Sequence, residues 1–253
     1  MNRKQLYEEK RNKKHRHNKM MLLTLFLICL VVFLIFHFHN NQKNTFINKY
    51  PIHGVLIDQN NGYLDFNALA KTNQKMIYIR STQGASYSDD NFDNNYQRGL
   101  GSGLPIGIYH IFGFSSKVNK QFENIKRTVN NDTGDLPIMI KIQYYNSYSR
   151  HNINLEKQKS RIKKLINQLH GYYNKKIILS TDYKSWKQLN FKIKYLDFSN
   201  NSKTEGNSVG KFIESDTPVK IKVSNQDEVF DGIGFSGDRK KWIKYLQKLR
   251  NED

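Results

Sequence analysis

The apolar residues of this chain fall into one long uncharged run, followed by several short runs at intervals. The long run spans 20–36 and contains no charged residue. With His37 and Phe38 it reaches roughly the 20 residues that a helix needs to cross a bilayer. A strongly basic stretch precedes the run, and charge is sparse after it until Lys43. This pattern predicts a single transmembrane helix near the amino terminus.

The charge asymmetry around this helix predicts its orientation. Positive residues gather on the cytoplasmic side of membrane helices, so the chain after about residue 40 is expected outside the membrane. A cleaved signal peptide is the alternative, but the run is long and no small-x-small cleavage motif follows it. The expected division is a basic cytoplasmic tail, a transmembrane helix, a polar tether and an extracytoplasmic domain: 1–19, 20–38, 39–50 and 51–253.

The short apolar runs lie between turn residues, as is typical of buried parallel strands. These runs are 55–57, 76–79, 105–109, 138–140 and 177–179. Helical stretches separate or follow them at 91–100, 117–130, 155–173 and 239–249. The alternation predicts an α/β fold, and a β/α barrel suits this length. The polar stretch 199–208 predicts a loop, while 211–229 has strand-like residues whose pairing is not readable.

The outer domain carries a large excess of positive charge. The chain has 41 Lys and Arg against 22 Asp and Glu, and its formal net charge is +19. An excess of this size favours an anionic partner. Outside a membrane, that partner is an anionic wall polymer or a lipid headgroup, and nucleic acid is not expected. The alternative is a basic, solvated surface without a ligand. The single Cys29 lies in the apolar run, so the domain folds without disulfides.

Five segments of the outer domain carry recognisable motifs. They read GVLIDQNNG (54–62), LDF (64–66), YIRSTQG (78–84), YSDDNF (87–92) and GLPIGIYHIF (103–112). In this order and spacing they resemble glycoside hydrolase family 25, the muramidases of the Chalaropsis lysozyme type. The resemblance implies a flattened, TIM-like β/α barrel with a sugar groove at the carboxyl ends of its strands. It also implies cleavage of peptidoglycan after N-acetylmuramic acid.

The carboxylates that the resemblance implies for catalysis are largely replaced. The family's first-strand Asp matches Leu56, and its Asp-x-Glu pair matches Lys141 and Gln143, which share one strand face. Gln143 has no acidic proton to give the leaving oxygen. Lys141 places a positive charge where a cationic transition state would form. We therefore expect no hydrolysis at these degenerate positions.

Two remaining carboxylates are candidates for a rearranged acid/base pair. Asp238 matches the late Asp of the family, and Asp58 lies two residues beyond Leu56 on the same strand face. The alternative roles are an ion pair between Asp58 and Lys141, and Asp238 as the N-cap of the last helix. The late W-Q-Y motif of the family has no counterpart around 222–225.

We expect the groove to bind glycan through polar side chains and flat tyrosine faces. The expected groove residues are Asp58, Tyr63, Gln83, Tyr109, His110, Lys141, Gln143, Tyr144, Tyr145 and Asp238. Gln83 replaces the Glu of a T-E-G motif, and His110 resembles the family's barrel histidine. No partner Cys or second His lies at metal-ligand spacing from His110, and no cofactor fingerprint occurs, so we expect no metal and no cofactor.

The sequence therefore favours a single-pass membrane protein with a lysozyme-like barrel that binds peptidoglycan or a wall-synthesis partner without cleaving it. One alternative is an active muramidase that uses Asp58 and Asp238. Another is a protein-interaction module of a membrane complex, with the span and the basic tail as contacts.

Overall fold

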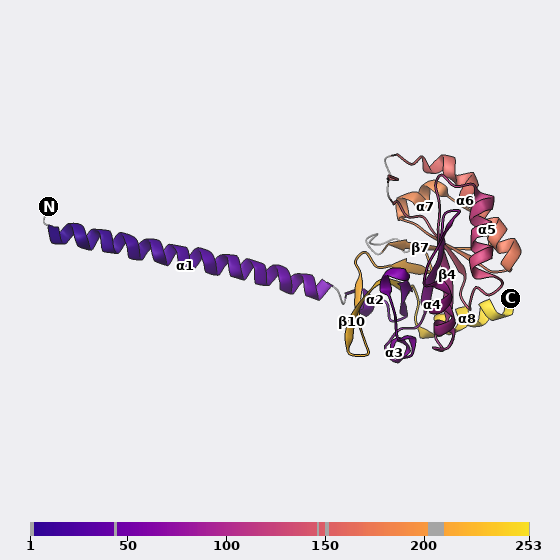
Figure 1. The fold of residues 1–253 in the computed structure, drawn as a ribbon, viewed down its shortest axis with the longest axis horizontal. Helices are drawn as coiled ribbons and strands as arrows, with labels where there is room; N and C mark the ends of the chain where they lie inside the picture. Colours follow the sequence, from indigo (N-terminus) through magenta and orange to yellow (C-terminus); the bar gives the residue numbers. More distant parts are fainter. Residues whose placement is uncertain (1–2, 43–44, 146, 150–151, 202–209, 253) are drawn as a thin grey trace. The chain divides into compact units, whose positions relative to one another are not determined.

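The computed structural model describes residues 3–42, 45–145, 147–149, 152–201 and 210–252. The chain forms two compact units, Met1–Thr45 and Phe46–Asp253. The first unit is helix α1 (Arg3–Gln42), drawn in indigo in Figure 1. Its segment Arg16–Ile35 is long and apolar enough to cross a membrane, and none of it is buried. This segment overlaps the span predicted from the apolar run.

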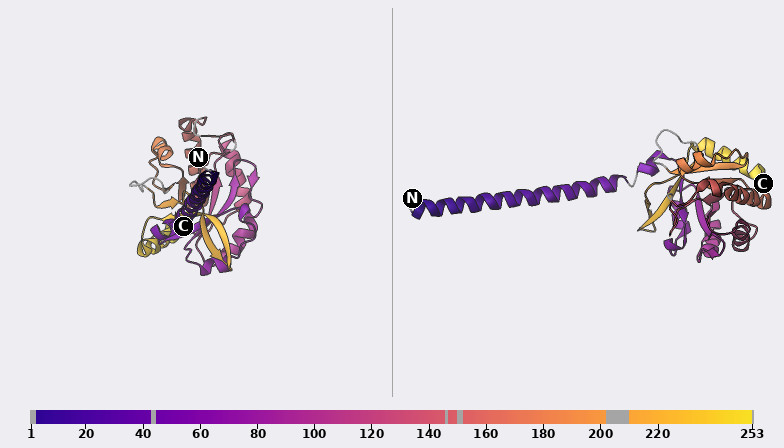
Figure 2. Two further views of the ribbon diagram at one scale, coloured as in Figure 1. Left: turned by 90° about the vertical axis from the view of Figure 1, so that its left-hand side faces the viewer. Right: turned by 90° about the horizontal axis from the view of Figure 1, so that it is seen from above.

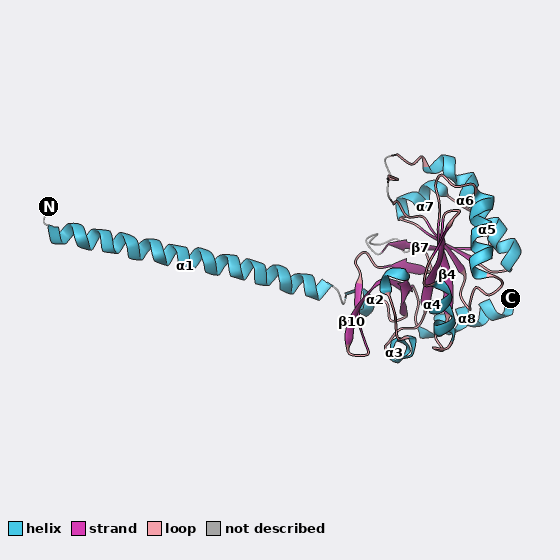
Figure 3. Cartoon of the chain, in the orientation of Figure 1, coloured by secondary structure: helices cyan, strands magenta, loops and turns pink. Residues whose placement is uncertain are grey.

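Within the described part of the second unit, eight strands close into a barrel (Figure 3). Around the ring these are β1 (His53–Ile57), β10 (Gln226–Phe235), β8 (Phe212–Glu214), β7 (Leu196–Asn201), β6 (Ile177–Ser180), β5 (Ile138–Lys141), β4 (Ile106–Ile111) and β2 (Ile77–Gln83). A parallel pairing of β1 with β2 closes the ring, and β10 runs antiparallel to both its neighbours. Outside the ring, β3 (Tyr87–Ser88) pairs with β2, and β9 (Val219–Val223) pairs with β10. The predicted β/α barrel is confirmed.

Helices cover the outer face of the barrel (Figure 2). The described helices of this unit are α2 (Thr45–Lys49), η1 (Gln59–Asn61), α3 (Phe66–Lys71), α4 (Phe92–Leu100), α5 (Val118–Val129), α6 (Leu155–Tyr173), α7 (Tyr183–Leu189) and α8 (Arg239–Glu252). Alternate strand residues such as Ile79, Ile108 and Ile140 pack outward in one apolar cluster with Ile162 and Leu165 of α6. The helical periodicity of the sequence predicts this packing.

The interior of the barrel is filled by the other set of alternating residues. Leu56, Tyr78, Tyr109 and Met139 belong to a second apolar cluster that is almost fully buried. At the amino ends of the strands, Tyr245 of α8 joins the same cluster, and its hydroxyl donates to Asp197 near the start of β7. The barrel is therefore a packed core, and its polar chemistry is confined to the strand ends.

Two glycines of the recognised motifs stand where no larger residue fits. A Cβ on Gly54 would lie 1.9 Å from the carbonyl oxygen of Met76, and a Cβ on Gly107 would lie 2.4 Å from the ring of Tyr78. Both glycines allow neighbouring strands and the Tyr78 ring to approach closely.

Some bounds differ from those expected. Residues Ser199 to Asn201 belong to β7 rather than to a loop, because they pair with β6 and β8, and the rest of the expected loop lies outside the described residues. Phe46, the first residue of the second compact unit, lies close to Gly232 of β10. The unassigned stretch 211–229 forms β8, β9 and the start of β10.

Candidate functional site

A largely buried lysine and two carboxylates meet at the carboxyl end of the barrel. The side chain of Lys141, at the end of β5, is 15% exposed. Its Nζ lies 2.9 Å from Glu214 Oε2 and 3.7 Å from Asp231 Oδ2. Asp231, whose side chain is 63% exposed, stands opposite Leu56 in the pairing of β10 with β1. The Leu56 side chain belongs to the buried interior.

This cluster borders a cavity of about 320 Å³, here called the Lys141 cavity. Its lining combines amide, hydroxyl, carboxylate and aromatic groups: Lys141, Ile142, Gln143, Tyr144, Ser180, Thr181, Asp182, Glu214, Ser215 and Asp231. The side chain of Gln143 is exposed to solvent, while Tyr144 is half-buried. Lys141 ends β5 and Gln143 lies two residues beyond it, and both residues line the cavity.

The electrostatics of the cavity keep Lys141 charged. Burial acts to lower the pKa of Lys141, but the carboxylates of Glu214 and Asp231 outweigh it and hold the pKa above its ordinary value. The hydroxyl of Ser180 also donates to Glu214, and that of Ser199 approaches it at 3.5 Å. An ammonium group in this state cannot accept a proton as a base, and Glu214 is already held by several donors.

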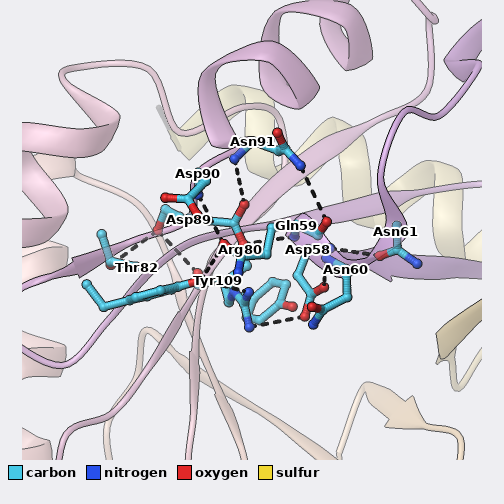
Figure 4. A network of polar contacts seen from close by, with 12 residues as sticks. Asp58, Gln59, Asn60, Asn61, Arg80, Thr82, Asp89, Asp90, Asn91 and Tyr109 are labelled. Carbon is cyan, nitrogen blue, oxygen red and sulfur yellow. Dashed lines mark hydrogen bonds and ion pairs between the residues drawn. The ribbon is translucent and has the colours of Figure 1, made fainter.

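A second network surrounds Asp58, immediately after β1 (Figure 4). The Arg80 guanidinium bridges two carboxylates, with Nη1 3.1 Å from Asp58 Oδ2 and Nε 2.8 Å from Asp89 Oδ2. The backbone N–H of Gln59 donates to the same Asp89 oxygen at 3.0 Å. The expected ion pair between Asp58 and Lys141 is therefore wrong, because Arg80 reaches Asp58 instead.

Asp238 lies at the other end of the barrel. Because β10 is antiparallel to β1, Asp231 stands beside Leu56 near the carboxyl end, whereas Gly234 stands beside His53 at the amino end. Asp238 follows β10, and its Oδ1 accepts the backbone N–H of Lys241 at 2.8 Å. It caps α8, as the N-cap alternative predicted, so the structure does not bring it together with Asp58.

The tyrosines expected in the groove divide into three environments. Tyr109 is buried in the barrel interior, and its ring centroid lies 5.9 Å from Lys141 Nζ. Tyr144 and Tyr145 stack on Phe114, with ring centroids 5.5 Å and 6.5 Å away. Tyr63 is 85% exposed. Of these four, Tyr144 is the one that lines the Lys141 cavity.

His110 is a structural residue rather than a groove residue, which corrects the expectation from sequence. Tyr109 points into the barrel, so its neighbour His110 points outward toward α5. There the ring nitrogens lie 2.7 Å from Thr82 Oγ1 and 3.1 Å from Gln121 Oε1. Complete burial lowers the pKa of His110 to about 4. Gln83 ends β2 with a half-buried side chain.

The family model of glycosyl hydrolases family 25 matches residues 56–201, which is more than half of the chain. The chain belongs to glycosyl hydrolase family 25. Solved structures agree on the fold. A family 25 glycosyl hydrolase from Bacillus anthracis, 23% identical, superposes with a TM-score of 0.69 over 78% of this chain and 94% of its own. A bacterial lysozyme from Streptomyces coelicolor, 17% identical, gives 0.65 over 80% and 98%.

Sequence relatives of this family 25 chain match shorter segments. The autolytic lysozyme of Clostridium acetobutylicum is 35% identical over 57 residues, which are 22% of this chain and 18% of that protein. The uncharacterised protein YegX of Escherichia coli K12 is 28% identical over 100 residues, 38% of this chain and 37% of that protein. The chain thus spans less than two thirds of the length of these relatives.

The sequence did not single out four charged residues of the two polar networks: Arg80, Asp89, Glu214 and Asp231. The orientation of Arg80 can be predicted from the sequence pattern, because Arg80 lies two residues after Tyr78 on the same strand. Alternation therefore puts its side chain on the same face of the sheet as the interior Tyr78. Glu214 and Asp231 had no such signal, since the pairing of β8 with β10 was not readable.

Proposed function

We propose that this family 25 barrel is anchored in a membrane, lies on its outer side and binds peptidoglycan in the Lys141 cavity without hydrolysing it. The observation that carries the proposal is the Lys141 ammonium paired with Glu214 and Asp231. Hydrolysis of a glycosidic bond needs one carboxylic acid to protonate the leaving oxygen and a second carboxylate to act on the sugar. Here the Gln143 amide stands at the first of these positions and the Lys141 ammonium at the second.

The same cavity retains groups that suit a sugar chain. The Gln143 amide and the hydroxyls of Thr181 and Ser215 can exchange hydrogen bonds with sugar hydroxyl and N-acetyl groups. The face of Tyr144 offers an apolar surface for a sugar ring. A concave site with a few convergent polar groups is the usual form of a small-molecule or glycan site.

The anchor is supported by helix α1. Its segment Arg16–Ile35 has a mean hydropathy of 2.4, enough for a span. The basic residues that precede the apolar run favour a cytoplasmic amino terminus. The barrel then lies on the side of the membrane where peptidoglycan is found.

The full-length chain in detergent, incubated with purified peptidoglycan, tests both parts of the cavity proposal. We expect retention on the wall material and no release of new reducing ends above a protein-free blank. Gln143→Ala and Tyr144→Ala should each lower retention several-fold. The matched controls Gln247→Ala and Tyr172→Ala change exposed residues of α8 and α6 and should retain full binding. Equal retention by all four variants would contradict binding in the cavity.

Hydrolysis is the second candidate, since Glu214 and Asp231 converge on one point of an open cavity. If Lys141 moves aside when glycan binds, these carboxylates become an acid/base pair. Hydrolysis by this pair would release reducing ends from peptidoglycan. The release should disappear in Glu214→Gln and persist in Asp238→Asn, because Asp238 lies at the far end of the barrel. Such release would overturn the non-hydrolytic proposal.

A further inference from the structure

A second cavity lies at the amino end of the barrel, opposite the Lys141 cavity. It is about 340 Å³ in volume and is here called the amino-end pocket. Its walls come from the residues just before β5, β6 and β7 and from the ends of α6 and α8: Asp135, Leu136, Pro137, His170, Asn174, Lys175, Lys176, Lys194, Tyr195, Lys248 and Leu249. The peptidoglycan-binding proposal makes no use of this pocket.

Positive charge dominates the pocket. Four of its lining residues are lysines and one is an aspartate. The Asp135 carboxylate accepts the backbone N–H of Ile106 at 3.2 Å, and Lys175 Nζ donates to the carbonyl of Gly134 at 3.0 Å. Like charges that gather around one concavity raise the local concentration of anions, because low-dielectric walls focus their field. The lining therefore favours a ligand with negative charge.

The floor of the pocket is apolar and aromatic. This favours an anionic ligand whose charged group is attached to a carbon skeleton. Leu136 and Leu249 belong to the buried interior cluster, and the ring of His170 stacks on that of Tyr195 at 3.6 Å. His170 Nδ1 lies 2.9 Å from the carbonyl oxygen of Lys175, so this nitrogen carries a proton and donates it. Apolar and aromatic walls beside ammonium groups suit a phosphate ester of a sugar or polyol.

The positions of the exposed apolar side chains distinguish between two candidate ligands of the pocket, a soluble polymer and the surface of a bilayer. A surface that seats in a membrane places large apolar side chains into the lipid beside its basic residues. In the described part of the barrel domain, the exposed large apolar residues are Tyr63, Leu100, Tyr172, Val229 and Ile243. None of them lines the amino-end pocket. A concave basic site without an apolar rim fits a phosphate that projects from a soluble chain.

We propose that the amino-end pocket binds the phosphodiester groups of an anionic sugar or polyol polymer. The barrel then has two binding sites at opposite ends, one for glycan and one for a polyanion. This site does not depend on the chemistry of the Lys141 cavity, so either proposal can fail alone.

A synthetic glycerol phosphate oligomer is the probe, titrated into the full-length chain in detergent. The triple variant Lys176→Gln, Lys194→Gln, Lys248→Gln should weaken binding at least tenfold. The control triple Lys120→Gln, Lys163→Gln, Lys164→Gln removes the same charge from exposed helix positions outside the pocket, and should change binding less than twofold. Matching thermal unfolding of both triples shows that the folds are intact.

Experiments with peptidoglycan fragments and with lipid vesicles identify the class of ligand that the amino-end pocket binds. Peptidoglycan fragments should not displace the oligomer, because the two sites lie at opposite ends. Equal losses in both triples, or no binding of the oligomer, would overturn the site. Binding to phosphatidylglycerol vesicles that needs the pocket lysines, without binding of the oligomer, would assign the site to a lipid headgroup and overturn the polymer proposal.

Discussion

At the scale of single residues, the role of Lys141 depends on the two carboxylates that it neutralises, those of Glu214 and Asp231. Its ammonium is nearly buried, and Glu214 has a side chain that is 13% exposed beside it. Removing one member of a buried ion pair leaves the other charge without compensation, which costs more than the pair itself contributes. The cluster therefore ties the chemistry of the cavity to the stability of β5 and β8.

The Glu214→Gln variant tests this link. We expect the free energy of unfolding to fall by about 3 kcal/mol, because Lys141 keeps its charge but loses its nearest counter-ion. Glu156→Gln breaks an exposed pair with Lys159 and should cost less than about 1 kcal/mol. Denaturant titration of both variants, of Lys141→Met and of the double variant Lys141→Met/Glu214→Gln measures the coupling. Additive effects in the double variant would contradict the ion pair.

His110 predicts how stability depends on pH. The unfolded chain protonates this side chain below its ordinary pKa of 6.5, whereas burial lowers the folded pKa to about 4. Between these values the unfolded state binds more protons, so stability falls by about 3 kcal/mol as pH is lowered through this window. Burial lowers the pKa of His53 as well, and its effect has the same sign.

Unfolding of wild type and His110→Asn at intervals from pH 7 to pH 4 checks this expectation. The variant should lose stability less steeply than wild type on acidification. Parallel curves for the two proteins would show that His110 does not contribute.

At the scale of elements, the close pairing of β1 with β2 sets a strict steric condition. Gly54→Ala should reduce the free energy of unfolding by about 3 kcal/mol, because its Cβ would overlap the Met76 carbonyl, a backbone atom that cannot move aside. Gly171→Ala is the control, since nothing lies within 4 Å of its added Cβ in α6. Alanine there should stabilise by about 0.5–1 kcal/mol. Similar effects at both sites would contradict the steric explanation.

The elements that the sequence predicts well are those whose pattern is local. The apolar runs of β5 and β6 and the periodicity of α6 each lie within one segment, and their bounds agree with the structure to within a few residues. The hairpin of β9 and β10 is harder to predict, because its residues alternate between buried and exposed without showing which strand pairs with which. The position of Glu214 at the cavity depends on such long-range pairing, here of β8 with β10. The full set of residues at the cavity could therefore not be predicted from the sequence.

At the scale of the whole molecule, the proposed membrane anchor sets the compartment in which the barrel works. If α1 stays attached, the membrane fraction should contain a species that carries both α1 and the barrel and resists alkaline extraction. Protease added to intact cells without their wall should digest the barrel and spare the amino-terminal tail. A shorter species released into the medium would identify a cleaved signal peptide, and protection of the barrel would contradict the proposed orientation.

The first and last strands of the ring, β1 and β10, pair with each other, and this has a consequence for biosynthesis. His53 pairs with Gly234, about 180 residues later in the chain, so this contact forms after almost the whole domain has been synthesised. Until Gln226–Phe235 leaves the ribosome, one side of β1 is an unpaired sheet edge, a template for aggregation. A reading frame that stops before Gln226 yields an open sheet that quality-control proteases should degrade, not a smaller working domain.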